Sequence, residues 1–168
     1  MNHVFHRVLG DEIPVAVQGD GVFIIDRDGK RYIDASGGAA VSCLGHSDAD
    51  VRRAIIDQTE KLSYAHTAFF TTEVAEELAE HLIASAPAGL DRVFYVSGGS
   101  EAVEVCLKLA RQYFFETGEL ERRHIIARRQ SYHGITLGAL SAGGHVWRSE
   151  PFEPMLFQAH HIASCYSY

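Results

Sequence analysis

The sequence predicts an α/β fold in which a β-hairpin and two helices precede the first part of a larger, incomplete sheet. Three observations point to it. An Asp-Gly pair separates two apolar stretches near the N-terminus. Apolar residues recur at helical spacing in several later segments. One of those helical segments also lies between two short apolar runs of the kind that form buried strands.

The N-terminal hairpin is predicted over residues 15–35. Its strands are 22–25 and 31–33, and Gly29 in the turn between them supplies the positive φ that a tight hairpin turn requires. The stretch 35–46 that follows is rich in Gly and Ala. Residues this small allow other groups to approach the backbone closely.

Two helices are predicted after this stretch. Asp48 is placed to cap a helix over about 50–62, because its side chain can accept a hydrogen bond from the first turn. Thr72 is placed in the same way before a second helix, which ends near Pro87.

A strand–helix–strand unit with a right-handed crossover is predicted next. Residues 93–96 are apolar, β-branched and aromatic, which is typical of a buried strand. Residues 101–116 keep helical apolar spacing, which puts Cys106 on the apolar face and predicts that it is part of the core. Residues 124–127 form the second predicted strand.

The chain beyond the second strand is predicted to hold one more helix. This helix follows residue 134 and ends near Gly143 and Gly144. The last stretch carries Trp147, Pro151 and Pro154 and is predicted to be a loop.

The composition is that of an ordinary globular protein and excludes several function classes. Of 168 residues 46% are apolar and 22% are charged, and the net charge is −7, so disordered classes are excluded and nucleic acid and anionic membranes are poor partners. Cys43, Cys106 and Cys165 lack C-x-x-C spacing, which fits the reduced thiols of a cytoplasmic protein. We expect neither a secretory signal nor a membrane span, because no apolar run is long enough.

The segment 97–101, Ser-Gly-Gly-Ser-Glu, is a candidate anion site between a predicted strand and a predicted helix. The free N–H groups and the positive dipole end of a helix attract phosphate, and Ser100 adds a hydroxyl donor. The alternative is that the segment binds no ligand and is only a tight turn that starts the helix. Ser100 is then the N-cap, and Glu101 stabilises the first helical turn. The segment matches neither the P-loop pattern nor G-x-G-x-x-G.

Two other chemistries compete with an anion site. Segment 98–102 is one residue short of the G-x-S-x-G nucleophile elbow of serine hydrolases, which would make Ser100 a nucleophile. Histidines 133, 160 and 161 are available as a base, but neither they nor an acid have a recognisable setting. A metal site is disfavoured, because His160 and His161 are adjacent and would point apart on a strand.

Tyr132 and His133 come directly after the second predicted strand of the unit. Ligands of parallel α/β sheets bind beyond the carboxyl ends of the strands, and an aromatic face there can stack on a flat heterocycle. The alternative is a tyrosine that packs against a helix, beside a histidine that is merely solvated.

Four motifs together resemble the class III aminotransferases, which are pyridoxal-phosphate enzymes of fold type I. They occur in the family's order over nearly the whole chain. The motifs are RYIDASGG at 31–38, LGH at 44–46, VSGGSEAVE with LKLAR within 96–111, and SYHG at 131–134.

The resemblance implies a role for several residues. Gly99 and Ser100 match the pair that holds the phosphate of pyridoxal 5′-phosphate. Tyr132 matches the aromatic residue that stacks on the pyridine ring, and His133 helps to shape the pocket. On the substrate side, the family's N-terminal segment lines the entrance, and Ser36 and Gly37 lie in the matching part of this chain.

The resemblance also implies contacts across a homodimer and a division of the chain. The region 64–70, with Phe69, matches residues that reach the partner's active site on the substrate side. Residues 1–47 match the N-terminal segment with its hairpin and Gly-rich substrate-side loop, and residues 48–168 match part of the cofactor-binding large domain.

The reaction of the family is transfer of an amino group from an amino donor to a keto acid or aldehyde. Its catalytic lysine lies downstream of the Tyr-His-Gly motif, whereas Lys30, Lys61 and Lys108 all precede that motif. We therefore expect no catalytic residue and no metal in this chain, which matches only the N-terminal portion of the family.

Three functions remain at this point. The first is a cytoplasmic aminotransferase, homodimeric when complete, of which this truncated chain is inactive alone. The second is a non-catalytic truncated product or pseudoenzyme that binds phosphate or a partner. The third is a serine hydrolase that uses Ser100.

Overall fold

The structure, a computed structural model, describes residues 3–8, 10 and 12–166. The chain divides into two compact units, residues 1–77 and residues 78–168. The boundary between the two units falls inside the helix Glu73–Ser85, and it reflects only how compactly each part packs. A functional boundary between residues 47 and 48 therefore stays a prediction.

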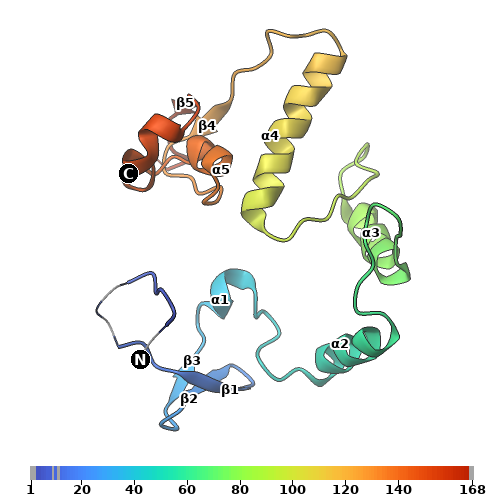
Figure 1. The fold of residues 1–168 in the computed structure, drawn as a ribbon, viewed down its shortest axis with the longest axis vertical. Coiled ribbons are helices and arrows are strands. Elements are labelled where there is room, and N and C mark those ends of the chain that lie inside the picture. The colour runs from blue at the N-terminus through green and yellow to red at the C-terminus, as the bar shows by residue number, and fades with distance from the viewer. Residues whose placement is uncertain (1–2, 9, 11, 167–168) are drawn as a thin grey trace. The chain divides into compact units, whose positions relative to one another are not determined.

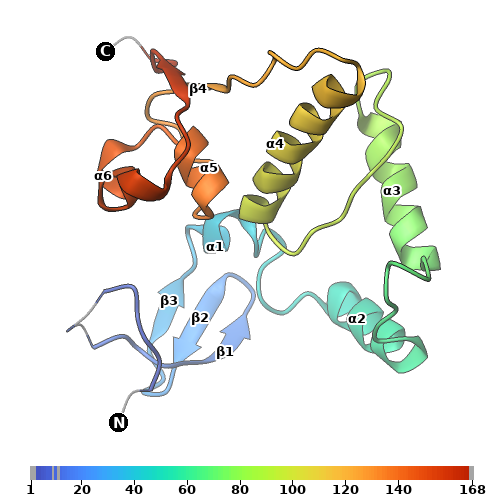
Figure 2. The same ribbon diagram turned by 45° about the horizontal axis from the view of Figure 1, so that its top comes forward.

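The first unit contains an antiparallel sheet in the order β1-β2-β3 (Figure 2). Its strands are β1 (Ala16–Asp20), β2 (Phe23–Asp26) and β3 (Arg31–Ile33). The predicted hairpin is confirmed, since Phe23 pairs with Ile33 and Gly29 has a φ of +81°. Strand β1 was not predicted, because its sequence includes Gly19 and its pairing with β2 is interrupted by an irregularity.

A tight left-handed turn, α1 (Gly37–Ala40), follows the sheet. All four residues have positive φ, including 60° at Ala39 and 70° at Ala40. The N–H groups of Val41 and Ser42 both donate to the Gly37 carbonyl, at 2.8 Å each, and close the turn. Alanine rarely adopts this conformation, because its Cβ crowds the following carbonyl oxygen.

The next two helices are α2 (Ala49–Lys61) and α3 (Glu73–Ser85), and both are confirmed with their predicted caps. The Asp48 carboxylate accepts the Val51 N–H at 2.8 Å, and the Thr72 hydroxyl accepts the Ala75 N–H at 3.3 Å. These bonds satisfy N–H groups that have no partner inside the helix.

The second unit is dominated by α4 (Gly99–Glu116), which begins two residues earlier than predicted (Figure 1). The predicted strand at 93–96 is wrong. These residues form no regular element, and Phe94 is 76% exposed. A strand requires a neighbouring strand for its N–H and C=O groups, and residues 93–96 belong to neither of the sheets found among the described residues. The predicted strand–helix–strand unit is therefore not formed.

The sheet of this unit has two parallel strands, β4 (Ile126–Arg128) and β5 (His160–Ile162). Strand β4 lies within two residues of its predicted place, and helix α5 (Leu137–Ala142) is confirmed. The predicted C-terminal loop is wrong. It contains α6 (Val146–Ser149), the 3₁₀ helix η1 (Glu150–Met155) and β5.

The small core of the second unit consists of Ala127, Ala139, Leu140 and Ala142, from β4 and α5. Cys106 is exposed, so its predicted place in a core is wrong. It lies on a helix whose large apolar side chains remain largely open, with Leu109 at 63% exposed. One end of α4 contacts α5, and both views show the two helices side by side there (Figures 1 and 2).

Candidate cofactor-binding site

The N-terminus of α4 is an open end with free donors. Gly98 is the N-cap and offers no side chain to the N–H groups of the first turn. A Cβ added at Gly98 or Gly99 would meet no atom within 4 Å, so the space beside each glycine is open, while the Glu101 carboxylate folds back and accepts the Ser97 N–H at 2.8 Å. Ser100 lies in the first turn, and the alternative that made it the N-cap is wrong. Such an end attracts an anion.

The Ser100 hydroxyl is held by the loop that carries Tyr132 and His133. Its oxygen accepts the Ile135 N–H at 3.0 Å. A Cβ on Gly134 would lie 2.5 Å from that oxygen and 2.9 Å from Ser100 Cα, so only glycine allows this approach. Because the oxygen accepts from an amide, the hydroxyl proton remains available for donation to an anion.

This geometry does not support Ser100 as a hydrolase nucleophile. Such a serine needs a histidine base within hydrogen-bond reach. Among the described residues no histidine bonds to Ser100. His161 bonds to the Gly143 carbonyl at 2.9 Å, and His160 bonds to His124 at 3.2 Å.

The Tyr132 ring is 59% exposed and is not packed into a core. The guanidinium of Arg148 lies 5.3 Å from its ring centroid and 4.3 Å from that of Trp147. A cation over aromatic faces is a favourable arrangement and orders all three side chains. His133, the next residue, is also exposed. Tyr132 thus remains available to a flat ligand.

The Glu104 carboxylate lies one turn beyond Ser100 on α4 and binds the start of α5. Its Oε1 accepts the Gly138 N–H at 2.7 Å and the Ala139 N–H at 3.3 Å. The Thr136 hydroxyl beside it lowers the pKa of this carboxyl most, the two N–H groups and Lys108 lower it further, and desolvation opposes them. The net effect is a pKa below the ordinary value of 4.5.

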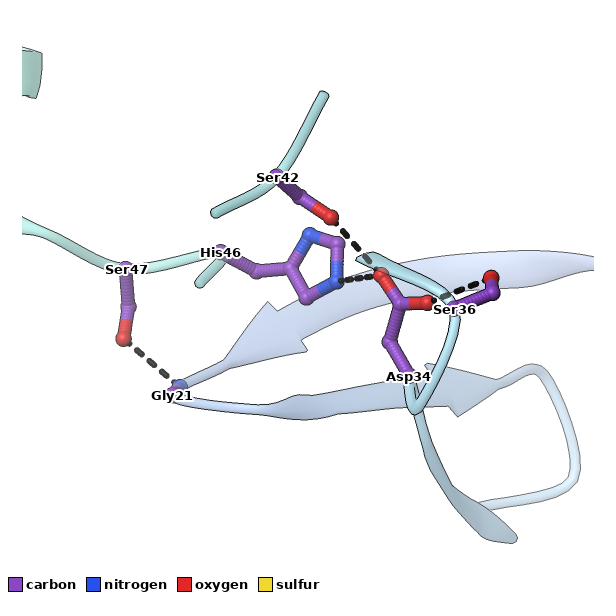
Figure 3. A network of polar contacts seen from close by, with 6 residues as sticks. All are labelled: Gly21, Asp34, Ser36, Ser42, His46 and Ser47. Carbon is purple, nitrogen blue, oxygen red and sulfur yellow. Dashed lines mark hydrogen bonds and ion pairs between the residues drawn. The ribbon is translucent and has the colours of Figure 1, made fainter. Parts of the chain in front are cut away.

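Ser36 and Gly37, which are predicted to lie on the substrate side, belong to the first unit and adjoin a polar network around Asp34 (Figure 3). Ser36 donates to Asp34 Oδ1 at 3.2 Å. Asp34 Oδ2 accepts the Ser42 hydroxyl at 2.8 Å and contacts His46 Nε2 at 2.9 Å.

The network keeps Asp34 ionised and ties the Gly-rich loop to the sheet. The Ser42 hydroxyl is the largest influence that lowers the Asp34 pKa below its ordinary 3.8, followed by His46 and Ser36, against desolvation. The Ser47 hydroxyl accepts the Gly21 N–H at 2.7 Å, next to the sheet. A Cβ on Gly45 would lie 2.6 Å from the Gly21 carbonyl oxygen, which confirms the predicted close approach.

The predicted site residues therefore fall into two groups. The structure brings Gly99 and Ser100 together with the Tyr132–His133 loop in the second unit. Phe69 lies in the first unit, 79% exposed, with its ring centroid 5.4 Å from that of His66.

Sequence reasoning missed Glu104, Arg148 and the network of Asp34, Ser42 and His46. Two features of the sequence could have indicated them. Ser100 and Glu104 are four residues apart on a predicted helix, and polar residues are spread through the Gly- and Ala-rich stretch 35–46.

Three further features of the described residues concern ligand binding in general. An open groove of about 1190 Å³ between α4 and segments 121–125 and 157–158 includes Glu104 and Gly138 but none of the predicted site residues. No described group of three His, Cys, Asp or Glu side chains is placed to hold a metal ion. No described helix combines the length and the apolar character that crossing a membrane requires.

An open helix N-terminus beside an aromatic loop defines a class of site, one that suits a ligand with both a phosphate and a flat ring. The family described as aminotransferase class-III matches residues 9–167, and the chain belongs to this family. The fold is accordingly the N-terminal part of the fold type I architecture, as the sequence predicted.

Individual relatives agree with this assignment. The chain is 43% identical over 168 residues to an uncharacterised aminotransferase of Schizosaccharomyces pombe, covering 99% of this chain and 37% of the relative. It is similar, with a TM-score of 0.90 and 30% identity, to adenosylmethionine-8-amino-7-oxononanoate aminotransferase from Methanocaldococcus jannaschii, covering 98% of this chain and 39% of that one.

A third similarity is to an amine transaminase of an uncultivated Pseudomonas species whose structure is PLP-bound. The TM-score is 0.84 at 32% identity, and the match covers 98% of this chain and 38% of that one. The chain thus spans less than two fifths of the length of these proteins.

Proposed function

We propose that this chain contributes the phosphate-binding and ring-stacking half of a pyridoxal 5′-phosphate site to a class III aminotransferase. The observation that carries the proposal is the contact between Ser100 and Ile135. It joins an open helix N-terminus to the loop of the exposed Tyr132 ring. Pyridoxal phosphate, when bound, stabilises negative charge on the carbon next to a substrate nitrogen.

Each residue has a defined task in this proposal. The first N–H groups of α4, at Gly99 and Ser100, and the Ser100 hydroxyl bind the phosphate. Tyr132 stacks on the pyridine ring and fixes its plane, and His133 closes the side of the pocket. Two observations support the fit of pyridoxal phosphate to these residues. The space beside Gly99 is open, and no described group accepts the hydroxyl proton of Ser100.

The remaining expectations are part of the same proposal. The complete enzyme transfers an amino group from an amino donor to a keto acid or aldehyde and acts as a cytoplasmic homodimer. Ser36, Gly37 and Phe69 line its substrate side. Residues 1–47 and 48–168 serve as the substrate-side segment and the cofactor-side domain.

Binding of pyridoxamine 5′-phosphate to the 168-residue chain tests this function. This ligand carries the phosphate and ring but no aldehyde, so it cannot attach to surface lysines. Pyridoxamine, without phosphate, is the reference ligand, and titration calorimetry measures both. We expect tighter binding of the phosphorylated form, and about 5- to 30-fold weaker binding for Ser100→Ala, the equivalent of roughly 1–2 kcal/mol for one hydrogen bond to a charged group.

Matched variants make the result specific. Tyr132→Ala is expected to weaken binding, whereas Tyr113→Ala, on a tyrosine of nearly equal exposure (60%), is not. Ser85→Ala is the hydroxyl control on α3. Equal affinity for the two ligands, or unchanged affinity in both site variants, would contradict the proposal. A covalent acyl group trapped on Ser100 would favour the hydrolase instead.

A further inference from the structure

Two side chains on one face of α4 hold both ends of a short segment of the neighbouring loop. Residues four apart on a helix lie on the same face, and Ser100 and Glu104 have this spacing. Ser100 binds the Ile135 N–H, and Glu104 binds the N–H of Gly138 and of Ala139. Residues 135–138 are therefore hydrogen-bonded to α4 at each end of the segment.

Close packing leaves the backbone little freedom to move between the hydrogen bonds to Ser100 and to Glu104. A Cβ on Gly138 would lie 2.6 Å from Oε1 and 2.7 Å from Cδ of Glu104. Gly134 is buried and in similarly close contact with Ser100. The two glycines let the loop backbone come near enough to α4 for the hydrogen bonds to Ser100 and Glu104 to form. These two side chains therefore set the distance between α4 and the loop.

The Glu104 carboxylate also supplies what the start of α5 lacks. The first N–H groups of a helix have no partner within it, and Thr136, at the N-cap of α5, makes no side-chain cap bond. Glu104 provides the acceptor from another helix. Glu104 is ionised at neutral pH, and the Thr136 hydroxyl, with the two N–H groups, favours that form by lowering the pKa; a charged acceptor strengthens both bonds.

We propose that Glu104 is a positioning residue of the candidate cofactor site: by holding the start of α5 it keeps Ile135 on the Ser100 hydroxyl and sets the place of Tyr132 beside the phosphate donors. The cofactor part of this inference rests on the proposed function, whereas the contact itself does not. Glu104 touches no ligand in this role and acts through the loop.

Amide-resolved hydrogen exchange of the 168-residue chain tests the contact without any ligand. In Glu104→Ala we expect the Ile135 N–H to exchange several-fold faster, and in Glu104→Gln, which keeps one acceptor oxygen, to return toward the wild-type rate. The His160 N–H, bonded to the Ile125 carbonyl at 2.8 Å, reports on the β4–β5 pairing and should not change. Glu116→Gln, at the far end of α4, is the control.

A proton NMR titration adds a signature that general loss of structure does not produce. The amide shifts of Gly138 and Ala139 should follow ionisation of a carboxyl in the wild type and lose that titration in Glu104→Gln. If Glu104→Ala does not fold, Glu104→Asp, which is one methylene shorter, replaces it. An unchanged Ile135 rate in the variant that folds, or equal acceleration at His160, would overturn the inference.

Binding of pyridoxamine 5′-phosphate then connects the contact to the site. We expect at least about 5-fold weaker binding in Glu104→Ala, with recovery in Glu104→Gln. Unchanged binding in Glu104→Ala, despite faster exchange at Ile135, would overturn the positioning role and leave the proposed function intact. If the wild type shows no phosphate-dependent binding, the proposed function fails, and the exchange rates alone decide whether Glu104 positions the loop.

Discussion

Replacing alanine by glycine should have opposite effects on stability at two positions. It should stabilise the protein at Ala39, in the left-handed turn 37–40, and destabilise it at Ala54, in α2. Ala39 has φ 60° and ψ 48°. A side chain in this region costs about 1–2 kcal/mol, whereas glycine loses about 0.5–1 kcal/mol more backbone entropy on folding than alanine. Ala39→Gly should therefore raise the free energy of unfolding by about 0.7 kcal/mol, the difference between the midpoints of these two ranges.

The matched control is Ala54→Gly in α2. Both alanines are exposed, so neither substitution removes buried contacts. Ala54 lies inside an ordinary helix, where glycine is about 1 kcal/mol less favourable. Urea unfolding followed by circular dichroism measures both variants, and an unchanged m-value is required for the comparison.

A local measurement separates strain in the turn from effects elsewhere. The N–H groups of Val41 and Ser42 both donate to the Gly37 carbonyl, and their hydrogen exchange should slow in Ala39→Gly. If Ala39→Gly instead lowers stability as much as Ala54→Gly does, the turn is not left-handed in solution and the reasoning from strain is wrong.

Three further predictions concern packing, pH and activity. Gly138→Ala should lower stability by about 1–3 kcal/mol, because its Cβ would crowd the Glu104 carboxylate. Gly99→Ala, with open space around it, should change stability little in the same thermal melts. Because the folded-state pKa of Asp34 is below its ordinary 3.8, its contribution should be complete above that pH and lost as the pH falls through the lower value. The difference in urea midpoint between wild type and Asp34→Asn should then shrink below about pH 4. Finally, the 168-residue chain with pyridoxal phosphate and an amine panel should show no transamination above free cofactor, and turnover would mean that one of its three lysines serves as the catalytic one.

Elements whose signals are local could be predicted from the sequence. The caps at Asp48 and Thr72 act within three residues, and the Gly29 turn acts within a hairpin. The Ser100 loop and Tyr132 were also found locally, from glycines at a helix start and an aromatic residue after a strand. Their meeting through Ile135 required the structure, because nothing near residue 100 in sequence indicates residue 135.

Elements that depend on distant partners could not be predicted in the same way. Residues 93–96 have the composition of a buried strand, but composition does not provide the neighbour that a strand requires. Strand β5 consists of two histidines and an isoleucine, and it forms because β4 is there to pair with it. Glu104 has the same local pattern as a solvated helix glutamate, and only its contact with Gly138 distinguishes it.

The parallel pairing of β4 with β5 has a consequence for the order of events during synthesis. The sheet of the first unit is complete once residue 33 has been made, whereas Ile126 waits for His160, which lies 34 residues later (160 − 126). At roughly 5–20 residues per second, this wait lasts about 2–7 s. During that time β4 has no β5 to pair with, so the sheet of the second unit cannot form while the sheet of the first unit already can.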